Sequence, residues 1–509
     1  MKTYDPLRLN LREKYASHVD LALWVARCNI SLHSIEDELL YNYHKHLGVR
    51  CPLSRRVFKE CVSRCAMISK KHMDEHLQSL SAFAITTDAW SDVRLRKYIA
   101  VTYHAVDPNT MKLFSFPRDL IYVPQSHNWF RVTNAISNAI NSHISGQSVM
   151  STVVTDNGSN FVKMAVALMG NLNENEVESS ILGPDDWNEP VQDLDSFETS
   201  GWRCVCHTMQ LAVLDCLDHE KGIAHASIKS LVSKVRDLSV AIRRSSSLRH
   251  QLSLVQKAND RKQLVPIIDM PTRWSTIYYM LERYELLSQD IAYLAILGVM
   301  DDLHLEILSH YELIQLRSLL KALKPMEEFV RLLEGEFYVT ISQVPARLNK
   351  ILANLSNMVA GNEIHTTALA LHHSVKTRLG FILDRPNLAL CCAALDPRYG
   401  HLDFVSDNLR DLVWGTLARW ILEYEEVRPK ERTEDERAAV PLPDYNHDIT
   451  HAQVCEVLHR FRKLFEELEQ SKRQKLRIPF NTGKRPTHYR IWYCLVSGPS
   501  KAFLTMINC

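Results

Sequence analysis

Apolar residues recur along most of the chain at the three- and four-residue spacing that places them on one face of an α-helix. Residues 8–80 show this spacing, and residues 225–425 show it again almost without interruption. Between these regions the pattern changes to short runs rich in β-branched and aromatic residues, which are typical of strands. The pattern therefore predicts an α/β unit between two helical regions.

The strand-like part of the chain has a regular order. Residues 83–91, 98–106 and 111–123 are expected to form a three-strand antiparallel meander. An amphipathic helix at residues 129–144 follows, and then come a β-branched strand at residues 152–155 and a further helix. The order βββαβα predicts one mixed sheet in which the first and fourth strands are neighbours.

The first and fourth strands are both expected to end in an aspartate. Asp88 closes the first, and Asp156 closes the fourth, before the turn and helix-capping sequence Asn157-Gly-Ser-Asn160. Two carboxylates close together cannot both stay ionised cheaply unless a cation neutralises them, and Mg²⁺ prefers such hard oxygen ligands. We therefore expect Asp88 and Asp156 to hold Mg²⁺ or Mn²⁺ in a phosphoryl-transfer site, which also needs a third carboxylate, usually from a helix.

The overall charge gives no reason for the chain to bind nucleic acid. The 509 residues are 46% hydrophobic and 23% charged, and their formal net charge is +1. No global field therefore attracts nucleic acid or a membrane, and any DNA contact must come from a local basic patch. No long apolar run and no signal peptide is present, so we expect an intracellular, soluble chain without a membrane partner.

One segment of the second helical region is locally basic. Between positions 234 and 262 only Asp237 and Asp260 are acidic, and the cations are Lys234, Arg236, Arg243, Arg244, Arg249, Lys257, Arg261 and Lys262. Such a segment suits a nucleic-acid backbone. The same residues would also occur on an ordinary solvated helix face, and the sequence leaves both interpretations open.

Cysteine and histidine show no zinc-finger spacing. The twelve cysteines are scattered without a C-x2-C…H-x3-5-H pattern, so we expect no structural zinc. Cys204-x2-His207 offers two metal ligands, which do not complete a zinc site, and by itself it favours core packing with one buried histidine. Arg273-Trp274, in a loop that leads into a helix, combines a charge with a ring on which a base can stack.

Four short motifs occur in an order that belongs to a known family. They are Thr87-Asp88-Ala-Trp90-Ser91, Thr155-Asp156-Asn-Gly-Ser-Asn160-Phe, Arg203-Cys204-x2-His207-x2-Gln-Leu211 and Thr272-Arg273-Trp274-Ser275. With them the chain resembles the hAT superfamily of cut-and-paste DNA transposases and their domesticated relatives among BED-finger proteins. The resemblance covers about residues 15–410.

The resemblance implies a fold of class α/β plus all-α, in which a ribonuclease H-like mixed sheet is interrupted by a large helical insertion. Asp88 and Asp156 fall on the first two metal-binding carboxylates, and Cys204 and His207 fall on a motif that flanks the active site. Trp274 falls where the family uses a tryptophan near a flipped or hairpinned DNA end, and its ring would hold an unstacked base. The expected catalytic residues are thus Asp88, Asp156 and His207, and the expected DNA contacts are Arg273, Trp274, Arg243 and Arg244.

The resemblance also suggests a division of the chain. We expect a helical module for DNA binding or dimerisation at residues 1–80, a ribonuclease H-like core at 81–220 with an acidic loop at 171–200, a helical insertion at 221–425, a linker at 426–448 and an atypical tail at 449–509.

The chain departs from the family pattern in two ways. No BED finger is found, and no Ser-Glu-Arg-x-Phe-Ser motif, which carries the third catalytic glutamate, follows Tyr399. Glu466, Glu467 and Glu469 are candidates for that role, but their pattern is typical of a charged helix surface.

We therefore expect a transposase-derived nuclear protein that binds DNA and is inactive for transposition. The sequence does not decide whether it is an enzyme, and it leaves both a homodimer and a hetero-oligomer open. The alternatives are a protein-interaction scaffold without DNA binding, and an active transposase with an unrecognised third glutamate.

Overall fold

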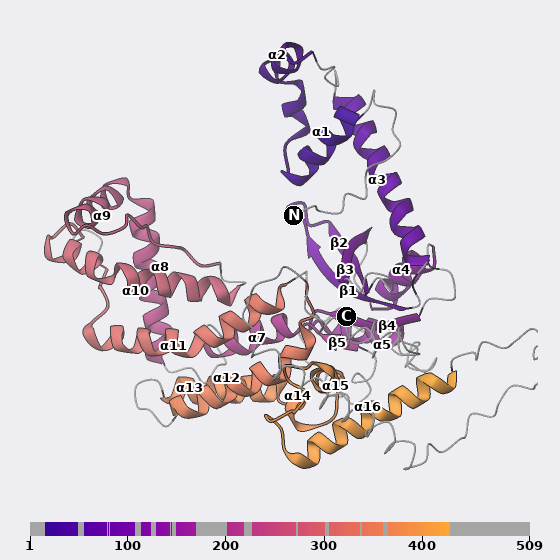
Figure 1. Cartoon of the computed structure of the whole chain (residues 1–509). Helices are drawn as coiled ribbons and strands as arrows, with labels where there is room; N and C mark the ends of the chain where they lie inside the picture. The colour runs from indigo at the N-terminus through magenta and orange to yellow at the C-terminus, as the bar shows by residue number, and fades with distance from the viewer. Residues whose placement is uncertain are drawn as a thin grey trace, which may run out of the picture.

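The computed structural model shows a mixed sheet joined to helical regions (Figure 1). It describes residues 16–48, 55–78, 80, 82–106, 113–123, 129–142, 144, 149–168, 201–217, 226–270, 273–300, 305–335, 338–359 and 365–427. The acidic loop expected at 171–200, the tail expected at 449–509 and the three candidate glutamates at 466, 467 and 469 lie outside these residues. The class, α/β plus all-α, agrees with the expectation from the sequence.

The sheet has five strands in the order β3-β2-β1-β4-β5. They are β1 (Ala82–Ser91), β2 (Lys97–Val106), β3 (Leu113–Tyr122), β4 (Val149–Thr155) and β5 (Gly201–Arg203). β1, β2 and β3 pair antiparallel, whereas β4 pairs parallel to both β1 and β5. The predicted meander and the predicted neighbourhood of the first and fourth strands are both confirmed.

Two details of the sheet differ from the prediction. β1 covers the predicted residues 83–91, but Asp88 is not its last residue, because pairing with β2 continues to Ser91. β5 was not predicted, because its three residues are too short for a strand pattern and it forms only by pairing with β4 from Val153 to Thr155.

One face of the sheet packs against α4 (Trp129–Asn141) and α5 (Ser159–Leu168). Alternate residues of β2 point into this core, and Ile99, Val101 and Tyr103 are fully buried there. α4 adds Val132, Ile136 and Ile140, which helical spacing places on one face. Each large apolar side chain buried in this way contributes about 1.5–3 kcal/mol.

The chain begins with a separate group of helices. It contains α1 (Ala16–Arg27), the 3-10 helix η2 (Leu32–Glu36), α2 (Glu38–His46) and α3 (Arg55–Gln78). Their small core consists of Ala22, Val25, Ile35, Phe58 and Cys65. The far end of α3 reaches the sheet, where Leu77 joins the sheet core and Asp74 accepts hydrogen bonds from Arg118 of β3 at 2.8 and 3.1 Å.

The second helical region shares one continuous core, which extends from Trp202 to Ala418. Its elements are α7 (Val205–Leu217), α8 (Ala226–Arg244), α9 (Ser246–Ala258), α10 (Trp274–Ile296), α11 (His310–Leu333), η5 (Ile341–Gln343), α12 (Val344–Val359), α13 (His365–Leu379), α14 (Phe381–Asp384), α15 (Leu388–Leu395) and α16 (Asp407–Val427). Figure 1 shows α8, α9 and α10 extending away from the sheet, while α14 and α15 return toward β5. α16 reaches Val427, inside the range predicted as a linker.

No helix among the described residues is long and apolar enough to cross a membrane.

Candidate functional site

Asp88 and Asp156 lie in the same register of two adjacent parallel strands. The last residues that pair between β1 and β4 are Thr86 and Val154, and each aspartate lies two residues further along its own strand direction. Side chains two residues apart point to the same side of a strand. The two carboxylates therefore lie on the same side of the sheet, just beyond the point where β1 and β4 stop pairing.

The pKa of Asp156 depends on its burial and on the groups around it. Burial is the main cause that raises the pKa of Asp156, and the charge of Asp88 raises it further. The Gly158 amide, which donates to Oδ1 of Asp156 at 3.0 Å, and the nearby His207 both act to lower that pKa. Asp88 and His207 thus both act on the carboxyl group of Asp156, and we call these three residues the acid pair and its histidine.

His207 is held in place by contacts between the first turn of α7 and the end of β4. The Cys204 amide donates to the carbonyl oxygen of Thr155 at 2.7 Å, and Nδ2 of Asn157 donates to Oγ1 of the buried Thr208 at 3.0 Å. The His207 side chain itself is exposed. The interpretation of a buried histidine in a core is therefore wrong. Asn157, which the sequence predicted as a turn residue, also connects the end of β4 to α7 through its hydrogen bond with Thr208.

Cys204 lies at the start of α7, next to the acid pair. Its thiol interacts with Cys206 and accepts hydrogen bonds from the backbone N–H groups of Cys206 and His207, which lowers the pKa of Cys204 to about 7 although burial opposes this. The same thiol–thiol contact and burial raise the pKa of Cys206. Among the described residues no group of three or more His, Cys, Asp or Glu side chains is arranged to hold a metal ion.

The expected DNA contact of Trp274 is not supported by its position. Its side chain is 1% exposed, and it packs in the core of the helical region at the start of α10. The ring therefore has no open face for a base, which corrects the prediction. Arg273 precedes it as the N-cap residue of α10 and is exposed. The sequence shows that an arginine and a tryptophan are adjacent, but only packing decides which of them points inward.

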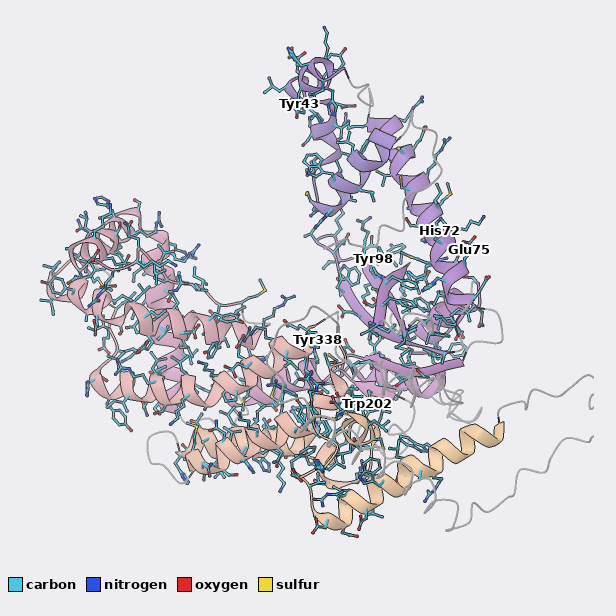
Figure 2. The ribbon with its side chains drawn as sticks, in the orientation of Figure 1. Tyr43, His72, Glu75, Tyr98, Trp202 and Tyr338 are labelled. Atoms are coloured by element: carbon cyan, nitrogen blue, oxygen red, sulfur yellow. The ribbon has the colours of Figure 1, made fainter. Side chains whose placement is uncertain are left out.

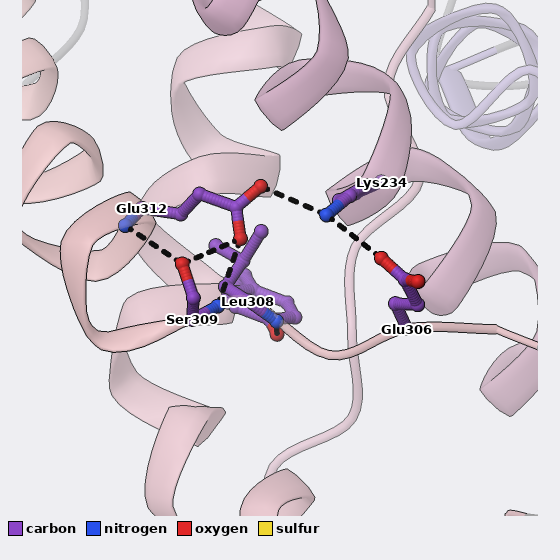
Figure 3. Close-up of polar contacts among 6 residues, drawn as sticks. Lys234, Glu306, Leu308, Ser309 and Glu312 are labelled. Carbon is purple, nitrogen blue, oxygen red and sulfur yellow. Dashed lines mark hydrogen bonds and ion pairs between the residues drawn. The ribbon is translucent and has the colours of Figure 1, made fainter.

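The basic segment at 234–262 is partly neutralised by carboxylates from other parts of the chain. Figure 3 shows Nζ of Lys234 between Glu306, at 3.2 Å, and Glu312, at 2.9 Å. Two further ion pairs join Arg236 to Asp269 at 2.8 Å and Arg261 to Asp290 at 2.7 Å. The segment therefore presents fewer free charges than its sequence suggests.

Arg243 and Arg244 remain exposed at the end of α8. Nη1 of Arg243 donates to the carbonyl oxygen of Pro266 at 3.1 Å, a contact that leaves its charge unneutralised. Figure 1 shows α9, which follows these arginines, at the end of the helical region farthest from β4 and β5. The structure thus does not bring Arg243 and Arg244 together with the acid pair.

Comparison with known proteins gives matches to part of the chain. Residues 202–312 match the family model described as the ZBED1 RNase-like helical domain. This range includes Cys204, His207 and Trp274, but neither Asp88 nor Asp156. Human zinc finger BED domain-containing protein 4 is 28% identical over 209 residues, which cover 40% of this chain and 17% of that protein. The chain is therefore similar, over part of its length, to a domesticated hAT-like family that includes BED zinc finger proteins.

Proposed function

We propose that the chain is a transposase-derived nuclear protein that binds nucleic acid and keeps two of the three carboxylates of a ribonuclease H-like metal site. The observation that carries the proposal is the shared register of Asp88 and Asp156 on adjacent parallel strands, beside His207. The strand order, with two antiparallel and two parallel pairs of neighbouring strands, supports the ribonuclease H-like assignment. The similarity to BED zinc finger proteins supports the transposon origin and the nuclear location.

The residues present fit a hard divalent cation. Asp88 is exposed, and Asp156 has one oxygen bonded to the Gly158 amide, so a second oxygen remains for an ion. The charge of Asp88 raises the pKa of Asp156, and a cation between them would relieve this repulsion. When bound, Mg²⁺ or Mn²⁺ would supply charge stabilisation for a phosphate group. His207 would contribute its imidazole to the same site, beside Asp156.

The acid pair is better suited to binding than to catalysis. No third carboxylate joins the acid pair within the described part of the chain. Removing one interaction that is made only in the transition state lowers a rate by orders of magnitude. We therefore expect the protein to bind DNA without carrying out transposition.

A cleavage assay tests the catalytic part of this proposal. Purified protein is incubated with Mn²⁺ and a hairpin-forming DNA, beside the Asp156→Asn variant as a matched control. We expect wild type and variant to give the same background of strand cleavage. Robust cleavage by the wild type that Asp156→Asn abolishes would show instead that the site is complete.

Salt titration tests the binding part. Affinity for DNA that comes from phosphate contacts falls linearly with the logarithm of salt concentration. We expect this dependence, with a modest slope, because Lys234, Arg236 and Arg261 are already paired with carboxylates. Lack of affinity at low salt would exclude DNA binding and favour a protein-interaction scaffold, the alternative that these internal ion pairs support.

A further inference from the structure

Three aromatic side chains form a continuous row across β1, β2 and β3. Trp90 pairs directly with Tyr98, and Tyr98 pairs directly with Tyr122. The ring centroids of Trp90 and Tyr98 are 6.0 Å apart with an interplanar angle of 28°, and those of Tyr98 and Tyr122 are 5.5 Å apart at 41°. We call Trp90, Tyr98 and Tyr122 the aromatic row; Tyr98 is labelled in Figure 2.

The aromatic row lies beside the acid pair. Asp88 precedes Trp90 by two residues on β1, so their side chains share one face of the sheet. Asp88 pairs with Ala100, which pairs with Leu120, and this set forms the next row on the same face. Trp90 therefore projects about 7 Å from Asp88 along the strand, at ~3.3–3.4 Å per residue.

This end of the sheet face is open, whereas its other end is covered. Trp90 is 43% and Tyr122 is 52% exposed, and Leu120 beside them is 63% exposed. At the opposite end of the same face Ala84 is buried, and burial lowers the pKa of its cross-strand neighbour His104 to about 4. Exposed apolar patches of this kind mark sites of interaction.

The hairpin next to the aromatic row carries positive charge. Between β1 and β2 the chain contains Arg94 and Arg96 with Asp92 as the single acid, and Lys97 is the first residue of β2. The Arg96 guanidinium lies 5.8 Å from the centre of the Tyr98 ring, and Asp92 holds it through hydrogen bonds at 2.6 and 2.7 Å. Asp92 also accepts hydrogen bonds from the Arg94 and Arg96 amides, both at 2.9 Å, and these bonds stabilise the conformation of the hairpin.

We propose that the aromatic row stacks the bases of an unpaired nucleic-acid segment while the hairpin cations contact its phosphates. Successive aromatic rings beside arginine and lysine are the combination that binds single strands, because unpaired bases expose their ring faces and duplex bases do not. The position of the row beside Asp88 places unpaired nucleotides next to the acid pair. This inference rests on the proposed nucleic-acid binding and adds the class of ligand, a single-stranded segment.

The test measures binding of a fluorescent oligothymidine strand at fixed salt by anisotropy. Trp90→Ala and Tyr122→Ala are each expected to bind about 5- to 150-fold more weakly, the range for one lost base–aromatic stack. Trp90→Tyr keeps a ring and is expected to retain most of the affinity. Tyr293→Ala removes an aromatic residue that is 53% exposed on α10, and it serves as the matched control with unchanged binding.

Two further probes separate stacking from charge. On an abasic strand of equal length, wild type and Trp90→Ala are expected to bind equally, because no base is present to stack. Arg94→Gln is expected to reduce the salt slope by about 1, whereas Trp90→Ala leaves the slope unchanged. Circular dichroism melting of every variant shows that the fold is kept.

Three results would overturn the inference. The first is that Trp90→Ala and Tyr122→Ala both bind oligothymidine as tightly as the wild type does. The second is that these variants lose as much affinity for the abasic strand as for oligothymidine, and the third is that the variants change only the self-association of the free protein. If salt-dependent DNA binding persists in these cases, the proposed function stands and only the role of the row is lost. If no nucleic acid binds at low salt, the proposed function itself has failed.

Discussion

Opposing influences act on the carboxyl group of Asp156. Burial and the charge of Asp88 raise its pKa, whereas the Gly158 amide and His207 lower it, and the net effect is upward. The fold therefore favours the neutral form of this side chain, and its ionised form at neutral pH is held at a cost in stability. That cost is typical of groups that are placed for binding or catalysis rather than for stability.

Asp156→Asn is expected to raise the melting temperature at neutral pH. A raised pKa contributes stability that is present below the unfolded pKa, near the ordinary value of 3.8, and that is lost as pH rises through the folded pKa. Asparagine stays neutral and keeps the oxygen that accepts the hydrogen bond from Gly158. The difference in melting temperature between Asp156→Asn and the wild type should therefore vanish as the pH falls below that ordinary pKa.

The measurement is a series of thermal melts of both proteins across this pH range. Asp88→Asn, at an exposed position, is the control and should show a smaller change. A lower melting temperature of Asp156→Asn at neutral pH would contradict the account.

Trp274→Ala is expected to destabilise the helical region by about 3–5 kcal/mol, the cost of removing a large aromatic side chain from a core. The reason is its 1% exposure among the apolar residues of this region. Urea denaturation measures the change, and Tyr293→Ala, at an exposed position, should stay within about 0.5 kcal/mol. A cost below about 1 kcal/mol for Trp274→Ala would show that the ring is not packed as described.

At the scale of elements, ion pairs connect helices and loops that are far apart in the sequence. α8 contacts the loop before α10 through Arg236 and Asp269, whose carboxylate side chain is 1% exposed. A buried carboxylate that loses its partner remains as an uncompensated charge. Such a pair specifies how the helices pack, whereas an exposed pair contributes little.

Arg236→Met is therefore expected to cost about 3–5 kcal/mol, because it leaves Asp269 buried and unpaired. The matched control is Arg317→Met, which breaks the exposed pair with Glu285 and should cost no more than about 1 kcal/mol. Chemical denaturation of both variants gives the comparison. Equal costs for the two would mean that the burial of Asp269 has no energetic consequence.

At the scale of the whole molecule, a net charge of +1 means that the proposed DNA binding would depend on a few local cations. These cations differ in whether the chain already neutralises them. Arg244 is exposed at the end of α8, whereas Lys234 is engaged by Glu306 and Glu312. Both residues contribute equally to the net charge, but the exposed Arg244 is more available to a phosphate than the paired Lys234.

Arg244→Gln is expected to reduce the slope of log affinity against log salt by about 1 if this arginine contacts phosphate. Lys234→Gln should leave the slope unchanged, because its ammonium group is paired within the chain. Fluorescence anisotropy with one duplex at several salt concentrations measures both slopes. A larger change for Lys234→Gln than for Arg244→Gln would contradict the assignment of free and paired charges.

The sequence by itself determined the features that depend on local order. β-branched runs predicted the meander and the fourth strand, and the βββαβα order placed Asp88 and Asp156 on neighbouring strands, as the pairing of β1 with β4 confirms. These predictions succeed because strand propensity, turn residues and helical spacing act over a few residues.

Only the tertiary structure decided which distant groups meet. β5 forms a strand because it pairs with β4. Lys234, Arg236 and Arg261 are neutralised by ion pairs with carboxylates 29 to 78 residues away. Trp274 turns into the core, and strand register aligns Trp90, Tyr98 and Tyr122. The physical reason is common to all of these features: burial, charge neutralisation and register depend on partners that come together only when the chain packs.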